Sequence, residues 1–302
     1  MPRSVYDMRC ELCPRMCRVD RRKGGGACGM TDTVKVARAS VHMWEEPPIS
    51  GNNGSGTVFF SGCPLKCVYC QNYGISHDNN GKEITVERLA EIMKELETKE
   101  VHNINLVSPT QFVPQIKSAV ASARASGMSL PVVYNTSGYE RAETVNGLSG
   151  TVDIYLTDFR YLTSELSLKY SGVSDYPEAA KASLEEMVRT AGPPVMDEEG
   201  IMKSGVIVRV LVLPGLAREA MMITDYIHGT YGDSVYISLM NQYTPTEHID
   251  AAAFPELCRK VTCEEYDEVV GHAEDIGVEL GFVQDGDTAD ESFIPEFDFS
   301  GV

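Results

Sequence analysis

The sequence contains no apolar run near the roughly 18 residues that a membrane-spanning helix needs. Its first residues also lack the apolar segment of a secretory signal peptide, which predicts a cytoplasmic protein without a membrane partner. Positive charge is scarce, because 26 Lys and Arg stand against 44 Asp and Glu, for a net charge of −18. Nucleic acid is therefore not an expected partner, since phosphate binding needs clustered Lys and Arg.

Cysteine is plentiful by comparison. Seven of the nine cysteines fall within the first 70 residues, while Cys258 and Cys263 stand apart near the other end. An odd count in a reducing compartment argues against a disulfide framework. The clustered seven therefore indicate metal binding, and we expect Cys258 and Cys263 to be ordinary thiols.

Three of the clustered cysteines, Cys63, Cys67 and Cys70, directly follow the apolar run Thr57–Phe60. A strand that ends in a short loop of three thiols is typical of an iron–sulfur cluster. Three ligands would leave one iron of a [4Fe–4S] cluster open, as a catalytic metal site keeps a free position. A zinc site that includes His77, or three buried structural cysteines, are the alternatives.

The second set lies in the N-terminal segment, with the spacing C-x2-C-x3-C-x10-C: Cys10, Cys13, Cys17 and Cys28. A segment this short and polar cannot form a core of its own, so a bound metal would determine its fold. We interpret it as an auxiliary Fe–S cluster site. Structural zinc, a rubredoxin-like single iron and metal-free cysteines remain alternatives, because each of these metal sites takes four cysteine ligands.

From residue 57 onward, short apolar runs alternate with helical periods. We expect strands at Thr57–Ser61, Asn103–Val107, Pro131–Tyr134, Val152–Leu156, Val206–Val212 and Val235–Leu239. Six β/α units imply an α/β fold with a parallel sheet and helices outside, and they are too few for an eight-stranded barrel. Helices are expected after Thr85 as a cap, over Pro114–Ser126, over Glu178–Ala191 and after a capping box at Thr262–Glu265.

The chain before and after these units is expected to form appendages. Val34–Ala39 has the composition of a short strand, and His42 is expected in the loop that follows it. We divide the chain into an N-terminal four-cysteine segment with its lead-in (1–55), a partial barrel (56–245) and an acidic C-terminal extension (246–302). The last 18 residues, 285–302, are expected to be mobile or to lie over the barrel.

The cysteine loop resembles that of the radical SAM superfamily. The phrases Trp44–Gly51, Gly54–Thr57 and Cys70–Tyr73 resemble an uncharacterised branch related to the pyruvate formate-lyase activating enzyme. This resemblance implies a partial TIM-type barrel that binds a [4Fe–4S] cluster and S-adenosylmethionine (SAM). Tyr69, beside the last cysteine, would border the adenine.

The resemblance also directs attention to the residues after each strand, because β/α barrels place their chemistry at the carboxyl ends of the strands. It implies SAM contacts from Ser108, Thr110, Asn135, Ser137, Asp158, Arg160 and Arg209, and substrate-side positions for Gln242 and Tyr243. Asp158 and Arg160 are two residues apart and share one strand face, where buried charges need partners.

Each of these positions also has an ordinary structural interpretation. Ser108 and Thr110 flank a proline typical of a helix start, Asp158 and Arg160 could be a solvated ion pair, and Tyr243 could be core packing. The sequence departs from the branch at two positions: Arg160 stands where Lys is usual, and Val210 stands where His is frequent.

The function implied is reductive cleavage of SAM, followed by hydrogen abstraction from a substrate. The resemblance suggests a glycine Cα of a glycyl radical enzyme as that substrate, with flavodoxin or ferredoxin as the electron donor, under anaerobic conditions. Radical modification of another protein, a peptide or a small molecule is the alternative, and an Fe–S electron-transfer protein without SAM turnover is the alternative outside enzymes.

Overall fold

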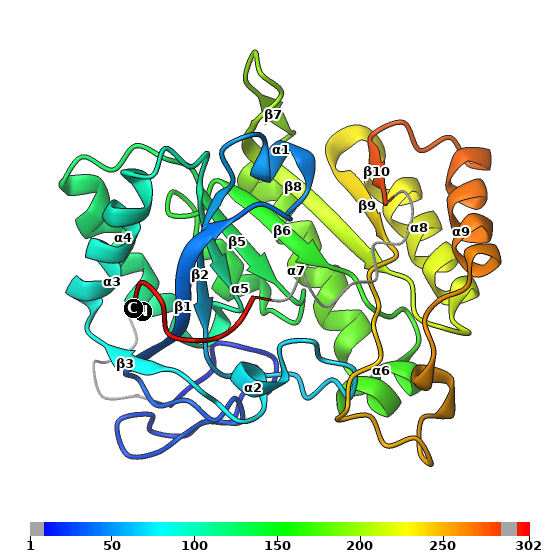
Figure 1. The fold of residues 1–302 in the computed structure, drawn as a ribbon, viewed down its shortest axis with the longest axis horizontal. Coiled ribbons are helices and arrows are strands. Elements are labelled where there is room, and N and C mark those ends of the chain that lie inside the picture. The colour runs from blue at the N-terminus through cyan, green and yellow to red at the C-terminus, as the bar shows by residue number, and fades with distance from the viewer. Residues whose placement is uncertain (1–8, 285–294) are drawn as a thin grey trace.

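A mostly parallel sheet forms the centre of the molecule in the computed structural model, which describes residues 9–284 and 295–302 (Figure 1). Its strand order is β10-β9-β8-β6-β5-β4-β2-β1-β3. Consecutive strands from β2 to β10 along this path pair in parallel. These strands are β2 (Ser55–Phe60), β4 (Ile104–Val107), β5 (Val132–Thr136), β6 (Ile154–Asp158), β8 (Met202–Leu211), β9 (Tyr236–Met240) and β10 (Gly281–Val283).

The predicted six-unit partial barrel is confirmed, with strand bounds that differ by a few residues. Within the described residues the sheet does not close, because its path ends at β10 and β3. Two further strands extend the β2 edge: β1 (Val34–His42) pairs antiparallel with β2 and with β3 (Lys82–Ile84). The short β7 (Val195–Met196) pairs antiparallel with β8.

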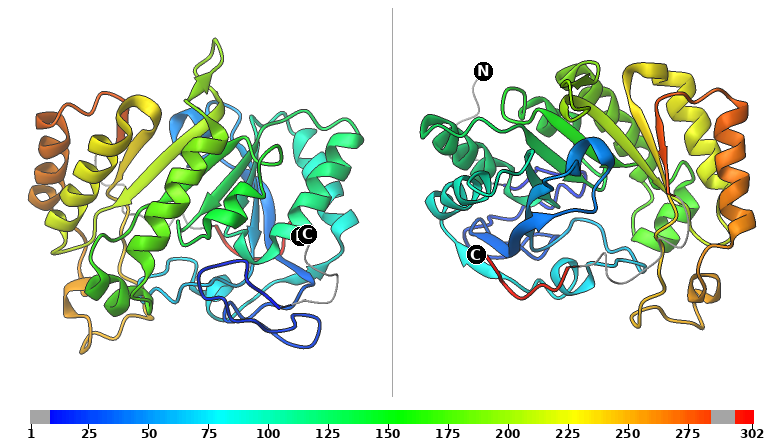
Figure 2. Two further views of the ribbon diagram at one scale, coloured as in Figure 1. Left: turned by 180° about the vertical axis from the view of Figure 1, so that it is seen from behind. Right: turned by 45° about the horizontal axis from the view of Figure 1, so that its top comes forward.

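Helices cover the outer face of this sheet, as Figures 1 and 2 show. The longer ones are α3 (Val86–Glu97), α4 (Val113–Ala125), α6 (Ser164–Ser171), α7 (Tyr176–Ala191), α8 (Ala217–Tyr231) and α9 (Cys263–Asp275). Single turns are α1 (Pro47–Ser50), α2 (Tyr73–Ser76), α5 (Ala142–Asn146) and the 3₁₀ helices η1 (Thr110–Phe112), η2 (Gly232–Ser234) and η3 (Pro255–Cys258).

Local sequence signals place several helix ends correctly. The Thr85 hydroxyl accepts the backbone N–H of Arg88 at 3.1 Å and so caps α3. Thr262 and Glu265 form the predicted capping box of α9, in which each side chain accepts the other's backbone N–H. These caps satisfy donors that the first turn of a helix leaves free.

The inner face of the sheet has an apolar layer beneath a polar one. Ile154, Leu156 and Ile207 belong to a fully buried inner cluster. Side chains alternate along a strand, so the next inward positions toward the carboxyl ends are Asp158 and Arg209. The apolar layer therefore forms a floor on which the charged residues stand.

The C-terminal region contributes to the barrel. β10 pairs in parallel with β9, and α9 packs beside α8, so the part of 246–302 that the structure describes adds a further unit to the sheet. Residues 295–302 run beside β1, where the Ala39 N–H donates to the Ser300 carbonyl at 2.9 Å. Residues 285–294 of the predicted tail lie outside the described residues. In the described chain, no helix has the length and apolar character needed to cross a membrane.

We expect Gly138→Ala to destabilise the fold more than the matched change Gly150→Ala. Both glycines have positive φ, +77° and +73°, so both variants carry a backbone strain of about 1–3 kcal/mol. Only at Gly138 would the new Cβ collide with the backbone oxygen of Asp158, whereas nothing lies within 4 Å at Gly150. Urea unfolding of the two variants measures the difference, and equal losses would contradict close packing of Gly138 against β6.

Candidate active site

The three-cysteine loop begins where β2 ends. Gly62 has a φ of +81°, and a Cβ there would lie 2.5 Å from Met30 Cγ and 2.8 Å from the Cys28 carbonyl oxygen, so the position requires glycine. The Gln111 side-chain amide donates to the carbonyls of Ser61 and Gly62 at 2.8 and 3.0 Å. These contacts fix the start of the loop against η1 and the N-terminal segment.

Burial keeps Cys63 and Cys70 protonated when no metal is bound. Burial, together with a smaller contribution from the neighbouring Cys67 and Cys70, raises the pKa of Cys63 to about 12. Burial raises the pKa of Cys70 in the same way. Coordination to iron is the environment in which such thiols lose their protons, because thiolate is the ligating form.

Hydrogen-bond donors surround the sulfur atoms. Arg160 Nη1 donates to Cys67 Sγ at 3.0 Å, the Ser171 hydroxyl lies 3.0 Å from the same sulfur, and the Ser76 hydroxyl lies 3.2 Å from Cys70 Sγ. Hydrogen bonds to ligating sulfurs are among the means by which a protein tunes an Fe–S cluster.

No three Cys, His, Asp or Glu side chains among the described residues are arranged as ligands of a single metal ion. A [4Fe–4S] cluster distributes its thiolates over different irons, so its ligands need not converge on one atom. Three thiols from one short loop, with donors around their sulfurs, fit a cluster of this kind.

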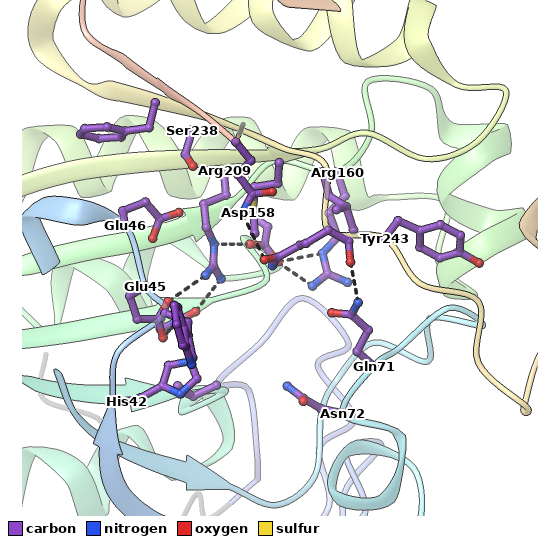
Figure 3. Close-up of a pocket in the computed structure, with 18 of the residues that line it drawn as sticks. His42, Glu45, Glu46, Gln71, Asn72, Asp158, Arg160, Arg209, Ser238 and Tyr243 are labelled. Carbon is purple, nitrogen blue, oxygen red and sulfur yellow. Dashed lines mark hydrogen bonds and ion pairs between the residues drawn. The ribbon is translucent and has the colours of Figure 1, made fainter. Parts of the chain in front are cut away.

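A cleft of about 560 Å³ opens beside Cys70 at the carboxyl ends of the strands (Figure 3). Strand register explains which side chains line it. Asp158 on β6 is the Cα partner of Arg209 on β8, which is in turn the partner of Ser238 on β9. Three neighbouring parallel strands thus place their inward polar side chains in one row across the cleft.

A chain of charged hydrogen bonds runs along this row. Asp158 accepts Arg209 Nε at 2.9 Å with one oxygen and Arg160 Nη2 at 2.6 Å with the other. Arg209 also donates to Asn135 Oδ1 at 2.7 Å and to Glu45 Oε2 at 3.3 Å. Since Arg160 also donates to Cys67, the chain connects the cysteine loop to the lead-in before β2.

The network sets the protonation state of its members. Burial opposes the charge on Asp158, but Arg209 and Arg160 outweigh it and hold the pKa of this carboxyl below its ordinary value. Burial also opposes the charge on Arg209, and the carboxylates of Asp158, Glu46 and Glu45 raise its pKa. Asp158 and both arginines are therefore charged at neutral pH.

Seven of the ten predicted SAM-contact and substrate-side residues meet in this cleft. Its lining includes Tyr69, Asn135, Asp158, Arg160, Arg209, Gln242 and Tyr243. The Tyr69 hydroxyl lies 2.6 Å from the Tyr161 hydroxyl, and the Gln71 amide donates to the Gln242 carbonyl at 2.9 Å. Tyr243 is 1% exposed and its hydroxyl donates to the Leu257 carbonyl at 2.6 Å, so only its ring faces the cleft.

Three of the predicted SAM contacts do not line the cleft: Ser108, Thr110 and Ser137. The Thr110 hydroxyl donates to the buried Glu140 carboxylate, and Thr110 lies in the wall of the four-cysteine pocket. Ser108 and Ser137 sit in the turns after β4 and β5, where they use backbone groups: the Ser108 N–H donates to the Asn135 carbonyl, and the Ser137 carbonyl accepts the Tyr176 hydroxyl.

The two departures from the branch have different consequences. Arg160 uses three nitrogens, Nη1 on Cys67 and Nε and Nη2 on Asp158, which a lysine with one ammonium could not reproduce in this geometry. Val210 belongs to the core between the sheet and the helices, so valine at this position leaves the cleft unchanged.

The largest omission of the sequence-based prediction is the pair Glu45 and Glu46, both of which line the cleft. Glu45 accepts Asn105 Nδ2 at 2.8 Å and Asn135 Nδ2 at 3.2 Å in addition to Arg209. The only sequence feature that could have indicated these two site residues is the pair of adjacent acids directly before Pro47–Pro48. His42, predicted in a loop, is instead the last residue of β1 and also lines the cleft.

The four N-terminal cysteines line one small pocket together with Pro64, Thr110 and Gln111. Cys10 and Cys17 interact through their thiols, and Cys28 influences both Cys10 and Cys13 electrostatically. The segment is attached to the barrel by Arg15 Nε, which donates to the Pro64 carbonyl at 2.9 Å, and by the Thr144 hydroxyl, which donates to the Leu12 carbonyl at 2.7 Å. The second cysteine set therefore borders the first.

Comparison with known proteins finds several chains that resemble this one. An uncharacterized protein of Methanocaldococcus jannaschii is 29% identical over 277 residues, which are 90% of this chain and 76% of that protein. Among solved structures, Streptococcus suis SuiB bound to the precursor peptide SuiA is 10% identical with a TM-score of 0.49, over 74% of this chain and 46% of SuiB. HydG, a maturase of the [FeFe]-hydrogenase, is 17% identical with a TM-score of 0.49, over 77% of this chain and 52% of HydG.

The chain spans about half the length of these two solved structures. The sequence profile of the Radical SAM superfamily matches residues 57–219, which is more than half of the chain and includes the cysteine loop and the charged row from Asp158 to Arg209. The protein therefore belongs to the radical SAM superfamily.

Proposed function

We propose that this protein cleaves SAM reductively and uses the resulting radical to abstract a hydrogen atom from a substrate. The observation that carries the proposal is the position of the cysteine loop, which opens through Cys70 into a cleft lined by Asp158, Arg160 and Arg209. Three thiols leave one coordination position for a ligand, and the cleft provides the space for it. Membership of the superfamily implies a [4Fe–4S] cluster and SAM as the cofactors.

When bound, this cluster and SAM supply one-electron cleavage of a sulfur–carbon bond and a 5′-deoxyadenosyl radical that abstracts hydrogen. The protein's own residues bind and orient the cluster and SAM. Cys63, Cys67 and Cys70 would hold the cluster, and Arg160 donates to the sulfur of Cys67. Such a donor stabilises negative charge on the sulfur, which favours the reduced state of a cluster.

The charged row supplies groups that match SAM. SAM carries a carboxylate, an ammonium and ribose hydroxyls, and the cleft offers guanidinium donors from Arg160 and Arg209 with acceptors on Asp158 and Asn135. Tyr69 is 5% exposed and lines the same cleft, which agrees with a position beside the adenine. Because these residues are fixed by one another, SAM would meet a preorganised surface.

The substrate is the less constrained part of the proposal. Resemblance of the lead-in and cysteine loop to activating enzymes favours a glycine Cα of a glycyl radical enzyme, with flavodoxin or ferredoxin as electron donor. Radical modification of another protein, a peptide or a small molecule uses the same cleft. An electron-transfer role without SAM turnover has less support, because an electron carrier has no use for the buried charged row.

We further propose that Cys10, Cys13, Cys17 and Cys28 hold an auxiliary Fe–S cluster, with zinc as the alternative. Their placement around one pocket supports this, as does the absence of any helix in the described residues before Val34. Pro64 lies in the wall of that pocket and directly follows Cys63, so a cluster here would be well placed to pass electrons to the catalytic loop.

Cys63→Ala should abolish both the catalytic cluster and SAM cleavage, whereas Cys258→Ala, at an exposed thiol, should change neither. After anaerobic reconstitution, the first variant should contain about four fewer iron atoms per chain than the wild type. With reductant and SAM, it should release no 5′-deoxyadenosine. Wild-type protein that releases none under strong reductant would rule out the proposed reaction and favour electron transfer.

The double variant Cys10→Ala/Cys13→Ala should lose the auxiliary metal and keep the iron of the catalytic loop. Metal analysis of the purified protein identifies which metal is lost, since iron with acid-labile sulfide indicates a cluster and zinc indicates a structural site. Cys258→Ala/Cys263→Ala, at two exposed thiols, is the matched control. Unchanged iron and zinc in the first variant would show that the N-terminal set binds no metal.

A further inference from the structure

Glu46 stands out from the other polar residues of the cleft. It is only 8% exposed, and its Oε2 atom is buried without a hydrogen-bond partner. The Ser238 hydroxyl is its side-chain hydrogen-bonding neighbour. Figure 3 shows the Glu46 carboxylate directed into the cleft, toward the side of Ser238 and Arg209. A buried carboxylate oxygen without a partner is costly, so its presence in a cleft points to a ligand that supplies the partner.

The lining of the cleft has more carboxyl groups than guanidinium groups. The ionisable acids and bases of its lining are the carboxyls of Glu45, Glu46 and Asp158, the guanidinium groups of Arg160 and Arg209, and His42. Burial lowers the pKa of His42, so it adds no positive charge at neutral pH. Burial raises the pKa of both Glu45 and Glu46, against the attraction of Arg209, so a cationic ligand beside Glu46 would favour its charged form.

The two guanidinium groups are already committed. Both oxygens of Asp158 are occupied by Arg160 and Arg209. Glu45 accepts from Arg209 and from two amide groups. Neither arginine donates a hydrogen bond to Glu46, and Arg209 acts on it only electrostatically. Glu46 is thus the carboxylate whose partner the cleft does not provide.

The position of Glu46 separates it from the cofactor end. In Figure 3, Gln71 and Asn72, which follow Cys70, lie on one side of the cleft, and Glu46 and Ser238 lie on the other, with Asp158 and Arg209 between them. The wall near Ser238 includes an aromatic surface, because Phe282 is the Cα partner of Ser238 and its ring stacks on Tyr236 at 5.2 Å. A carboxylate beside an apolar wall is suited to bind a ligand that carries a cationic group at the end of a hydrocarbon stem.

We propose that Glu46 binds an ammonium or guanidinium group of the substrate and thereby orients that substrate for hydrogen abstraction. This inference rests on the proposed radical reaction and names the substrate class for the same cleft. An ionic partner inside a cleft gives strong discrimination, because a neutral analogue would leave the carboxylate buried and unpaired.

The test uses two pairs of probes, each with one charged and one neutral member. N-acetyl-arginine methylamide and N-acetyl-citrulline methylamide have nearly the same shape, and N-acetyl-lysine methylamide and N-acetyl-norleucine methylamide form the second pair. Binding of each to the reconstituted, SAM-loaded protein is measured by calorimetry. We expect at least one charged probe to bind about tenfold or more tightly than its neutral partner. Equal binding within both pairs by the wild-type protein would overturn the proposal, whether or not any variant folds.

The variant Glu46→Gln tests whether Glu46 is the source of the preference for charged over neutral probes. Glutamine keeps the shape and a hydrogen-bonding group but removes the charge, so the ratio between charged and neutral probes should fall to about one. Glu83→Gln, which removes the same charge from exposed β3, should keep the wild-type ratio. If Glu46→Gln keeps the wild-type ratio and instead weakens SAM binding, Glu46 pairs with the sulfonium of SAM and the proposal fails.

The outcomes also distinguish this inference from the reaction on which it depends. Release of 5′-deoxyadenosine by the wild-type protein tests the reaction alone and needs no probe. Cleavage of SAM without any charge preference would leave the proposed function standing and remove the inference. Charge preference without cleavage would show a cation-binding cleft in a protein that does not perform the reaction, which would also overturn the assigned role in hydrogen abstraction.

Discussion

The site depends on one carboxylate held between two guanidinium groups. Asp158 stands at the last position of β6, above the apolar floor of Ile154 and Leu156, where its side chain is 17% exposed and burial opposes its charge. Arg160 and Arg209 compensate the cost of that burial by donating to Asp158. These ion pairs in turn fix the orientation of both arginines. Arg160 also donates to the sulfur of Cys67, and Arg209 also donates to Glu45. The cysteine loop, the strand ends and the lead-in before β2 are therefore positioned through a single acid.

The barrel and the charged row were predictable from the sequence because their signals are local. Alternating apolar runs identify the strands, and a charge inside an apolar strand, as at Arg209, has to meet a partner. The i and i+2 spacing of Asp158 and Arg160 predicted that both side chains lie on the same face of the strand. The serine and threonine side chains after β4 and β5 were harder to place, because a backbone turn decides their direction and no strand periodicity applies there. The predicted contacts Ser108, Thr110 and Ser137 do not line the cleft.

Glu45 and Glu46 could not be assigned from local pattern. They precede the first barrel strand, and their partners are 60 to 164 residues away along the chain: Asn105, Asn135 and Arg209 for Glu45. Only the folding of β1 against β2 brings the lead-in over the cleft. β10 escaped prediction as a strand for a related reason, since three residues carry too little periodicity and the pairing with β9 defines it.

The attachment of the four-cysteine segment has a consequence for biosynthesis. Its anchors are the carbonyls of Leu12 and Glu11, which accept from Thr144 and Arg141, while Arg21 donates to the Gln111 carbonyl. The sequence separations of these contacts run from 90 to 132 residues. During translation the N-terminal thiols leave the ribosome long before the helices that receive them exist. Closure of this segment over Gly62 is therefore a late event, and until it occurs seven cysteines of a growing chain are open to oxidation.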